Sequence, residues 1–199
     1  MEDFVSLKEG DVIIQNGANS MVGTALLQIA NARNIKTINI IRQRPDHDVV
    51  VEKLKKLGGY MVVTEDYVGT PDFKRLISDL PVPKLALNCV GGSSATEMAR
   101  TLAPGGTLVT YGGMSKKPVT IPTSLFIFKD IQLKGFWMTT WVEQHSQQEK
   151  EQMLNSLYTL IRNNQLKLWI EKWNFNKFSQ ALQRSREPYR DSKVLLTMD

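Results

Sequence analysis

Short apolar runs alternate with amphipathic stretches along the first two thirds of the chain. Runs rich in β-branched and aliphatic residues predict six strands, at residues 12–16, 36–42, 60–64, 84–90, 106–113 and 131–137. Apolar residues at helical spacing predict helices between them, at residues 21–33, 48–58, 70–80, 94–103 and 124–130. In the first helix, the residues predicted to share one apolar face are Val22, Leu26, Ile29 and Ala30. Because helices between strands act as crossover connections, the pattern predicts an α/β fold with a doubly wound, parallel six-stranded sheet.

The pattern changes after Thr140. A long amphipathic helix is predicted over residues 146–164, a further helix over 175–185 and a terminal strand over 192–198. These elements have no evident place in the six-stranded sheet. We therefore expect the tail to belong to another domain or to dock against one.

Composition excludes several classes of protein. Hydrophobic residues make up 42% and charged residues 23% of the 199 residues, a globular balance. The apolar runs are shorter than the roughly 18 residues that suggest a membrane span. The lysines and arginines behind the net charge of +5 are scattered along the chain. They favour anionic ligands in general and do not indicate nucleic acid as a partner. His47, His145 and Cys89 do not have the spacing of a zinc cluster, and no metal site is predicted.

The stretch "VIIQNGANSMVG" (12–23) is typical of a strand that enters a phosphate-binding turn, although most of the glycines are missing. A dinucleotide site needs small residues at three places, which fall here on Ala18, Ser20 and Gly23. The Asn19 amide and the Ser20 hydroxyl are suitable donors to phosphate oxygens, next to the N-terminus of the following helix. The alternative is a structural turn with an asparagine in the left-handed conformation.

The end of the second predicted strand suggests which cofactor binds. An NAD site places an acidic residue near this point, whereas this chain has Arg42 and Arg44. Two guanidinium groups suit a 2′-phosphate, so the sequence favours NADPH. Asp46 follows closely and is an acid that suits the ribose of NADH, so NADH remains an alternative cofactor. The structural alternative is a solvated loop that carries two arginines.

Two further strand ends carry residues that suit a nicotinamide ring. "YGGM" (111–114) follows the fifth strand, and "FWM" (136–138) follows the sixth. Ligands bind at the carboxyl ends of strands in open α/β sheets, where glycines let the backbone approach a ring. Core packing is the alternative for Trp137. Cys89, at the end of the fourth strand, is interpreted as a buried packing residue because the sequence has no nearby histidine to activate it.

The segments "VIIQNGANSMVG", "INIIRQRPD", "LALNCVGG", "GGTLVTYGGMSKKPV" and "FIFKDIQLKGFW" resemble the medium-chain dehydrogenase/reductases. Within that family the chain is most similar to the mitochondrial trans-2-enoyl-CoA reductases, over essentially all its residues. The resemblance implies a Rossmann sheet and NADPH-dependent reduction of trans-2-enoyl thioesters, as enoyl-CoA or enoyl-ACP, in mitochondrial fatty-acid synthesis. A quinone-type reductase of the same superfamily is the alternative enzyme.

The resemblance also implies which residues contact the cofactor. They are Asn19, Ser20, Met21, Val22, Arg42, Gln43, Arg44, Tyr111, Gly112, Gly113, Met114, Phe136, Trp137, Met138 and Lys193. The chain departs from the family at Met21, where glycine is usual, and at Gln43, where an acid is common. The Met21 side chain is expected to narrow the approach of the pyrophosphate.

The resemblance divides the chain into an NADP-binding Rossmann domain (1–145), a last helix on its side (146–166) and a segment of the catalytic domain (167–199). It assigns no catalytic residue here, because the family's tyrosine lies in an N-terminal domain that nothing in this sequence matches. We expect this chain to bind NADPH and to turn over enoyl thioesters slowly or not at all.

The resemblance also implies partners and a location. It implies a homodimer formed near residues 124–138 and a mitochondrial location, although residues 1–11 have no transit-peptide character. A short form of the protein in the cytosol or nucleus is the alternative. "LYTLI" (157–161) approximates the L-x-x-L-L helix that docks in nuclear receptors, so a non-catalytic nuclear-receptor interaction module is a further alternative, with core packing as the simpler interpretation of these leucines.

Overall fold

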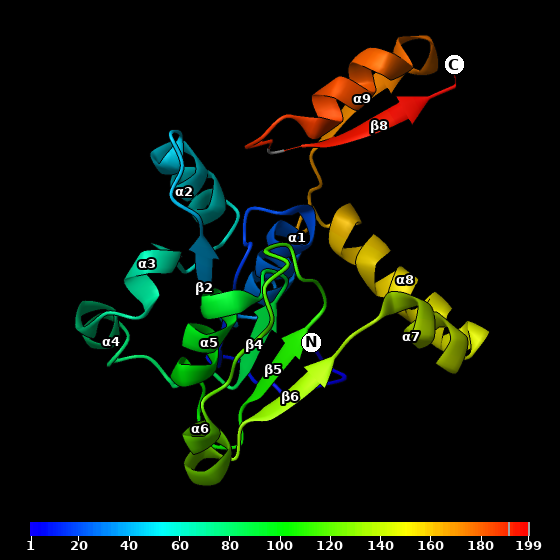
Figure 1. Cartoon of the computed structure of the whole chain (residues 1–199). Coiled ribbons are helices and arrows are strands. Elements are labelled where there is room, and N and C mark those ends of the chain that lie inside the picture. The colour runs from blue at the N-terminus through cyan, green and yellow to red at the C-terminus, as the bar shows by residue number, and fades with distance from the viewer. Residues whose placement is uncertain (191, 199) are drawn as a thin grey trace.

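The computed structural model describes residues 1–190 and 192–198, and its main body surrounds one six-stranded sheet (Figure 1). The strands are β1 (Val12–Gln15), β2 (Lys36–Ile41), β3 (Met61–Thr64), β4 (Leu85–Asn88), β5 (Thr107–Thr110) and β6 (Gln132–Gly135). Their order is β3-β2-β1-β4-β5-β6, and every neighbouring pair is parallel. The predicted doubly wound parallel sheet is confirmed, and the strand order reverses between β1 and β4.

Helices cover both faces of this sheet (Figure 1). The helices between the strands are α1 (Met21–Asn31), α2 (His47–Lys56), α3 (Glu65–Val68), α4 (Pro71–Leu76), α5 (Gly92–Thr101) and α6 (Thr123–Lys129). Buried residues of α3 to α6, such as Phe73 and Met98, pack with Ile14 and Ile40 on one face. Helices α1 and α2 pack on the other face, where Leu27 and Leu54 meet in one cluster. The central strands are therefore buried on both sides, as continuous apolar runs predict.

The predicted apolar face of the first helix has two partners. Leu26 and Ala30 are buried against the sheet as expected, whereas Val22 is 54% exposed. Val22 and Ile29 instead line a groove with Leu157 of α8 (Gln147–Arg162). Leu26 lines the same groove, so the predicted apolar face of α1 is continuous from the sheet to α8.

The elements that follow β6 contribute no strand to the main sheet. These elements are α7 (Met138–Gln144), α8, β7 (Ile170–Asn174), the 3-10 helix η1 (Phe175–Lys177), α9 (Phe178–Arg186) and β8 (Lys193–Thr197). Strands β7 and β8 pair in parallel as a two-stranded sheet, with α9 as their crossover. We call β7, η1, α9 and β8 the C-terminal unit, and it stands beyond the carboxyl ends of the main strands (Figure 1).

The segment that leads into the C-terminal unit is fixed to α1 and α2. The Gln28 side chain donates from Nε2 to the Lys167 carbonyl (3.0 Å) and accepts from the Lys167 N–H (2.9 Å). The Lys53 ammonium lies 4.8 Å from the centre of the Trp169 ring, a cation–π contact. These contacts hold the start of the C-terminal unit against the face of the sheet that α1 and α2 cover.

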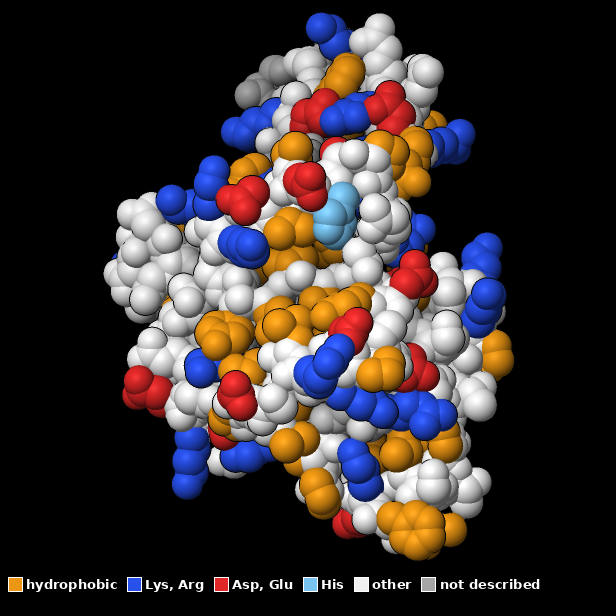
Figure 2. Space-filling model, turned by 90° about the vertical axis from the view of Figure 1, so that its left-hand side faces the viewer, with side chains coloured by type: hydrophobic (Ala, Val, Ile, Leu, Met, Phe, Trp, Pro, Cys, Tyr) orange, Lys and Arg blue, Asp and Glu red, His pale blue; other side chains and the backbone are white. Residues whose placement is uncertain are grey.

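Charged residues are mixed on the surface. Figure 2 shows lysine and arginine side chains interspersed with acidic and apolar ones on the side of α2 to α5, without one continuous basic stripe. Within residues 1–190 and 192–198, the structure has no helix that is long and apolar enough to cross a membrane.

Candidate cofactor site

The turn after β1 depends on Gly17. This residue has φ +60°, and a Cβ on it would lie 2.6 Å from the Cys89 sulfur, so only glycine fits. Ala18 next to it is fully buried, and Asn19 is half-buried. The left-handed residue of the turn is thus Gly17, and the alternative with an asparagine in that conformation was wrong.

Gly23 lets α1 pack closely against this turn. A Cβ on Gly23 would lie 2.6 Å from the Gly17 carbonyl oxygen and 2.7 Å from Ala18 Cα. Ser20 caps the helix, because its Oγ accepts from the Gly23 N–H at 3.1 Å, and its own proton stays available to donate. Close packing at Gly23 is the role that a dinucleotide fingerprint gives its third small residue.

Met21 and Val22 form the first turn of α1. Met21 is half-buried and Val22 is exposed. The N–H groups at the start of a helix have no partner within the helix, and the helix dipole adds a partial positive charge there. The N-terminus of α1 therefore offers backbone donors and a favourable field to an anion at the carboxyl edge of the sheet.

The two arginines after β2 differ in their surroundings. Arg42 and its neighbour Gln43 are exposed, whereas the Arg44 side chain is only 3% exposed. Arg44 donates from Nη2 to Asp46 Oδ2 (2.8 Å) and to the Tyr189 carbonyl (2.7 Å). Its Nε donates to Asp46 Oδ1. Both carboxylate oxygens of Asp46, the acid considered above as a ligand for the ribose of NADH, therefore already accept from Arg44.

The segment after β5 packs against the end of β4. A Cβ on Gly112 would lie 3.3 Å from the Cys89 Cβ, whereas nothing lies within 4 Å of one on Gly113. Met114 is 81% exposed. Tyr111 buries its hydroxyl without a hydrogen-bond partner among the described residues. Gly113 thus leaves open space beside the backbone, as a close approach by a ring requires.

A buried amide network joins these turns, and the sequence-based prediction missed it. Asn88 accepts at Oδ1 from Asn16 Nδ2 (2.8 Å) and from the N–H groups of Val90 (3.2 Å) and Gly91 (2.9 Å). The Asn88 amide donates to Thr110 Oγ1 at 3.1 Å. One side chain therefore ties the ends of β1, β4 and β5 together. Amides at the ends of otherwise apolar strands were the available signal.

Aromatic residues follow β6. The Phe136 ring packs edge-to-face on Phe4, with centroids 5.9 Å apart. Trp137 is 70% exposed, so core packing, the alternative for this residue, was wrong, and Met138 is 47% exposed. Phe136 and Trp137 line a cavity of about 470 Å³ together with Trp141. An aromatic wall thus stands at the carboxyl end of β6.

The structure brings most of the predicted residues to one edge but places Lys193 elsewhere. Lys193 begins β8 in the C-terminal unit, where its N–H donates to the Trp169 carbonyl at 3.0 Å. The turn at Gly17, the Cys89 end of β4 and Gly112 are in contact through the distances given above. An anion site at α1, an open backbone at Gly113 and an exposed guanidinium at Arg42 fit the parts of a nicotinamide dinucleotide.

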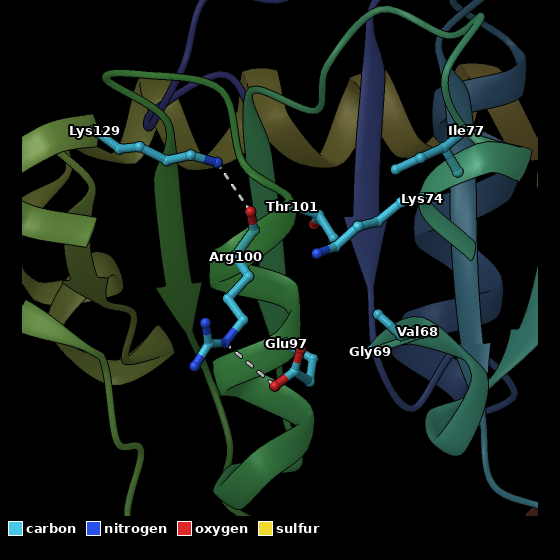
Figure 3. A pocket seen from close by; sticks show the side chains of 8 residues that line it. All are labelled: Val68, Gly69, Lys74, Ile77, Glu97, Arg100, Thr101 and Lys129. Atoms are coloured by element: carbon cyan, nitrogen blue, oxygen red, sulfur yellow. Dashed lines mark hydrogen bonds and ion pairs between the residues drawn. The ribbon is translucent and has the colours of Figure 1, made fainter. Parts of the chain in front are cut away.

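Another cavity, of about 520 Å³, lies between α4 and α5 (Figure 3). Lys74, Arg100 and Lys129 line it, and the Lys129 ammonium donates to the carbonyls of Arg100 (2.9 Å) and Leu102 (3.0 Å) at the end of α5. None of the predicted cofactor residues lines this cavity. It lies on the opposite face of the sheet from α1 and is separate from the candidate site.

Cys89 is expected to react slowly with thiol reagents. It is 8% exposed, its sulfur lies 3.6 Å from the Asn16 carbonyl oxygen, and burial raises the pKa of the thiol. Less thiolate at neutral pH means slower attack. Its rate with a chromogenic disulfide should rise at least about a hundredfold in denaturant. A native rate equal to the denatured rate would contradict the packing role.

A family profile described as "Zinc-binding dehydrogenase" matches residues 22–157. The chain belongs to the zinc-binding dehydrogenase family. Within this family it is similar to the mitochondrial enoyl-[acyl-carrier-protein] reductases of Dictyostelium discoideum (56% identity over 100% of the chain) and mouse (48% over 98%). The chain spans 57% and 53% of the length of these relatives. In the part of the chain that the structure describes, no group of three or more His, Cys, Asp or Glu residues is placed to hold a metal ion.

Several solved structures share this fold. The Etr1p/NADP/crotonyl-CoA complex superposes with a TM-score of 0.86 at 38% identity, over 98% of this chain and 56% of the other. The Etr1p/Etr2p heterodimer of Candida tropicalis gives 0.87 at 37% identity, with the same coverage. A Bacillus thuringiensis protein described as an NADPH:quinone reductase is 21% identical with a TM-score of 0.82, which establishes the fold alone.

Proposed function

We propose that this chain is the NADPH-binding part of a 2-enoyl-thioester reductase. The enoyl reductase names of its relatives and the NADP in the Etr1p complex support this function. The observation that carries the choice of cofactor is Arg42, an exposed guanidinium at the end of β2, where an NAD site has an acid. A 2′-phosphate is the group that such a guanidinium recognises.

Each part of the site then has a role. The N-terminus of α1, with the Ser20 hydroxyl, binds the pyrophosphate, and Arg42 and Gln43 bind the ribose phosphate. The open backbone at Gly113, with Tyr111, Gly112 and Met114 around it, receives the nicotinamide ring, and Phe136, Trp137 and Met138 exclude water beside it. The half-buried side chain of Met21 narrows the approach of the pyrophosphate, as its departure from the family suggests.

The reaction proposed for the whole protein is reduction of the double bond of a trans-2-enoyl-CoA or enoyl-ACP. NADPH supplies a hydride to C3 of the substrate, and C2 takes a proton. The residues of this chain hold and orient the cofactor, and we assign none of them a proton-transfer role. The division into residues 1–145, 146–166 and 167–199 is part of this proposal, with the last segment completing a catalytic domain.

We propose a homodimer formed through the outer edge of the sheet and a mitochondrial location. All residues of β6 are exposed, so its outer backbone edge is unpaired among the described strands. In the neighbouring α6, Ile127 is 68% and Phe128 is 80% exposed. The heterodimer of Candida tropicalis Etr1p with Etr2p and the mitochondrial names of the relatives support both parts of the proposal.

Neither alternative function gains support. Leu157 and Leu160 of the "LYTLI" segment are half-buried and face α1 across the groove that Val22 and Ile29 line, and none of the relatives cited above is named for receptor binding. The likeness to the quinone reductase concerns the fold only. The reductase of enoyl thioesters is therefore the function that we propose.

The test measures binding of NADPH to the 199-residue chain, and then turnover. We expect NADPH to bind at least about tenfold more tightly than NADH, by calorimetry. We expect the chain to oxidise NADPH with crotonyl-CoA far more slowly than a relative of full length. Failure to bind NADPH contradicts the assignment of NADPH as the cofactor. Crotonyl-CoA turnover equal to that of the full-length relative contradicts the proposal that this chain is only the cofactor-binding part of the enzyme.

A further inference from the structure

The two arginines after β2 are not equivalent, although both are candidates for the 2′-phosphate. Arg42 is exposed and has no hydrogen bond or ion pair among the described residues. Arg44 is buried, and two of its three guanidinium nitrogens donate to Asp46, with the Tyr189 carbonyl as a further acceptor. Arg42 can therefore meet a phosphate directly, whereas Arg44 must first lose its partners.

Replacing those partners by a phosphate is unfavourable. The hydrogen bond from Arg44 lowers the pKa of the Asp46 carboxyl, so the acid is ionised at neutral pH. A phosphate that displaced this carboxylate would leave two anions side by side. Breaking this charge-assisted pair leaves the guanidinium of Arg44, whose side chain is 3% exposed, without its counter-ion, whereas the half-exposed Asp46 is solvated. The structure thus excludes Arg44 from the surface that a 2′-phosphate reaches.

Arg44 contacts the C-terminal unit at a strained residue. Tyr189 lies in the loop between α9 and β8 and has φ +59°, which is rare for a bulky residue. Arg44 binds its carbonyl, and the guanidinium carbon lies 5.1 Å from the centre of its ring. A conformation of this kind persists only where its surroundings enforce it, and Arg44 supplies both contacts.

Arg44 also completes the attachment of the C-terminal unit. Gln28 and Lys53 hold the segment before β7, through Lys167 and Trp169. Arg44 holds the loop before β8, whose first residue is Lys193. The entry to both parallel strands is thereby fixed to the main body, on the side of the carboxyl ends of its strands (Figure 1).

We propose that Arg42 alone of the two arginines recognises the 2′-phosphate, and that Arg44 is a positioning residue that fixes the loop before β8 and so the place of the C-terminal unit beyond the carboxyl ends of the main strands. The proposal rests on the proposed NADPH binding. It assigns cofactor discrimination to Arg42 and the geometry of the C-terminal unit to Arg44. The two substitutions therefore have different signatures.

The experiment is titration of NADPH and NADH by calorimetry into the 199-residue chain, Arg42→Ala and Arg44→Ala. Arg42→Ala should weaken NADPH at least about tenfold and NADH less than about twofold, because only NADPH carries the phosphate. Arg44→Ala should weaken both cofactors by the same factor and keep their ratio. A fall of the NADPH-to-NADH ratio in Arg44→Ala similar to that in Arg42→Ala overturns the proposal. Arg75→Ala, an exposed arginine on α4, is the matched control.

Hydrogen exchange provides a second reading that does not depend on cofactor binding. Amides of residues 187–198 should exchange faster in Arg44→Ala than in the parent chain, and at an unchanged rate in Arg42→Ala. Tyr189→Gly, which keeps the carbonyl and relaxes the backbone but removes the ring, is the milder variant if Arg44→Ala does not fold. Unchanged exchange in a folded Arg44→Ala, or in Tyr189→Gly in its place, overturns the positioning role. A parent chain that binds neither cofactor contradicts the proposed function instead.

Discussion

Gly23→Ala is expected to abolish measurable NADPH binding and to destabilise the chain by about 3 kcal/mol. The new methyl group would lie 2.6 Å from the Gly17 carbonyl oxygen and 2.7 Å from Ala18 Cα. Both neighbours are backbone atoms in a turn that is itself packed on Cys89, so they have no side-chain rotamer through which to relax. The helix must move away from the turn, and its N-terminal donors move with it. Urea denaturation and calorimetric titration measure the two effects.

Gly113→Ala separates the two effects. A Cβ there meets nothing within 4 Å, and Gly113 does not have a positive φ. We expect its free energy of unfolding to stay within about 0.5 kcal/mol of the parent chain. Its NADPH affinity should fall, because the methyl group enters the space proposed for the ring. If Gly23→Ala unfolds at the same urea concentration as the parent chain and binds NADPH with the same affinity, then neither stability nor cofactor binding requires the close packing of α1 on the turn.

Asn88→Leu is expected to lower the free energy of unfolding by about 4 kcal/mol. The side chain is fully buried, and its oxygen accepts from Asn16 and from the N–H groups of Val90 and Gly91. Leucine has a similar size but no acceptor, so these buried donors lose their common partner. Each unsatisfied buried group costs about 1–3 kcal/mol. Thermal and urea unfolding measure the loss.

Two variants serve as controls for Asn88. Asn155→Leu makes the same exchange at an exposed position of α8 and should change stability by less than about 0.5 kcal/mol. Asn88→Asp keeps the acceptor oxygen and removes the donor to Thr110. Its loss of stability should therefore lie between those of Asn155→Leu and Asn88→Leu. Equal stability of Asn88→Leu and the parent chain would show that water or backbone movement satisfies the donors.

The main sheet was predictable from the sequence because its strands are continuous apolar runs separated by periodic helices. The helix signal Thr70–Pro71 also acts as expected, since Thr70 accepts from the Phe73 N–H at the start of α4. Three elements were missed. Helix α3 is a single turn, α7 begins "MTTWV" without a side-chain cap, and β7 reads "IEKWN" without a clear alternation. Tertiary packing decides such short elements more than propensity does.

The candidate site was predictable as a location and less so in its details. Strand ends identify the edge because parallel strands deliver their carboxyl ends to one side. The sequence does not show that Arg44 donates to the Tyr189 carbonyl, because that hydrogen bond joins segments far apart in the chain. Nor does it show that Gly17, rather than Asn19, adopts the positive φ. These outcomes depend on packing across elements.

The strand order also sets the order in which the sheet can assemble. Val12 of β1 pairs with Lys36, whereas the other side of β1 pairs only with β4, where Ile13 meets Leu85. While a ribosome extends the chain, β1, β2 and β3 are complete before residues 65–84 and then β4 emerge. During that interval the apolar edge of β1 is an unpaired template for other chains. Slow refolding and a need for chaperones during synthesis are the expected consequences of the central position of β1.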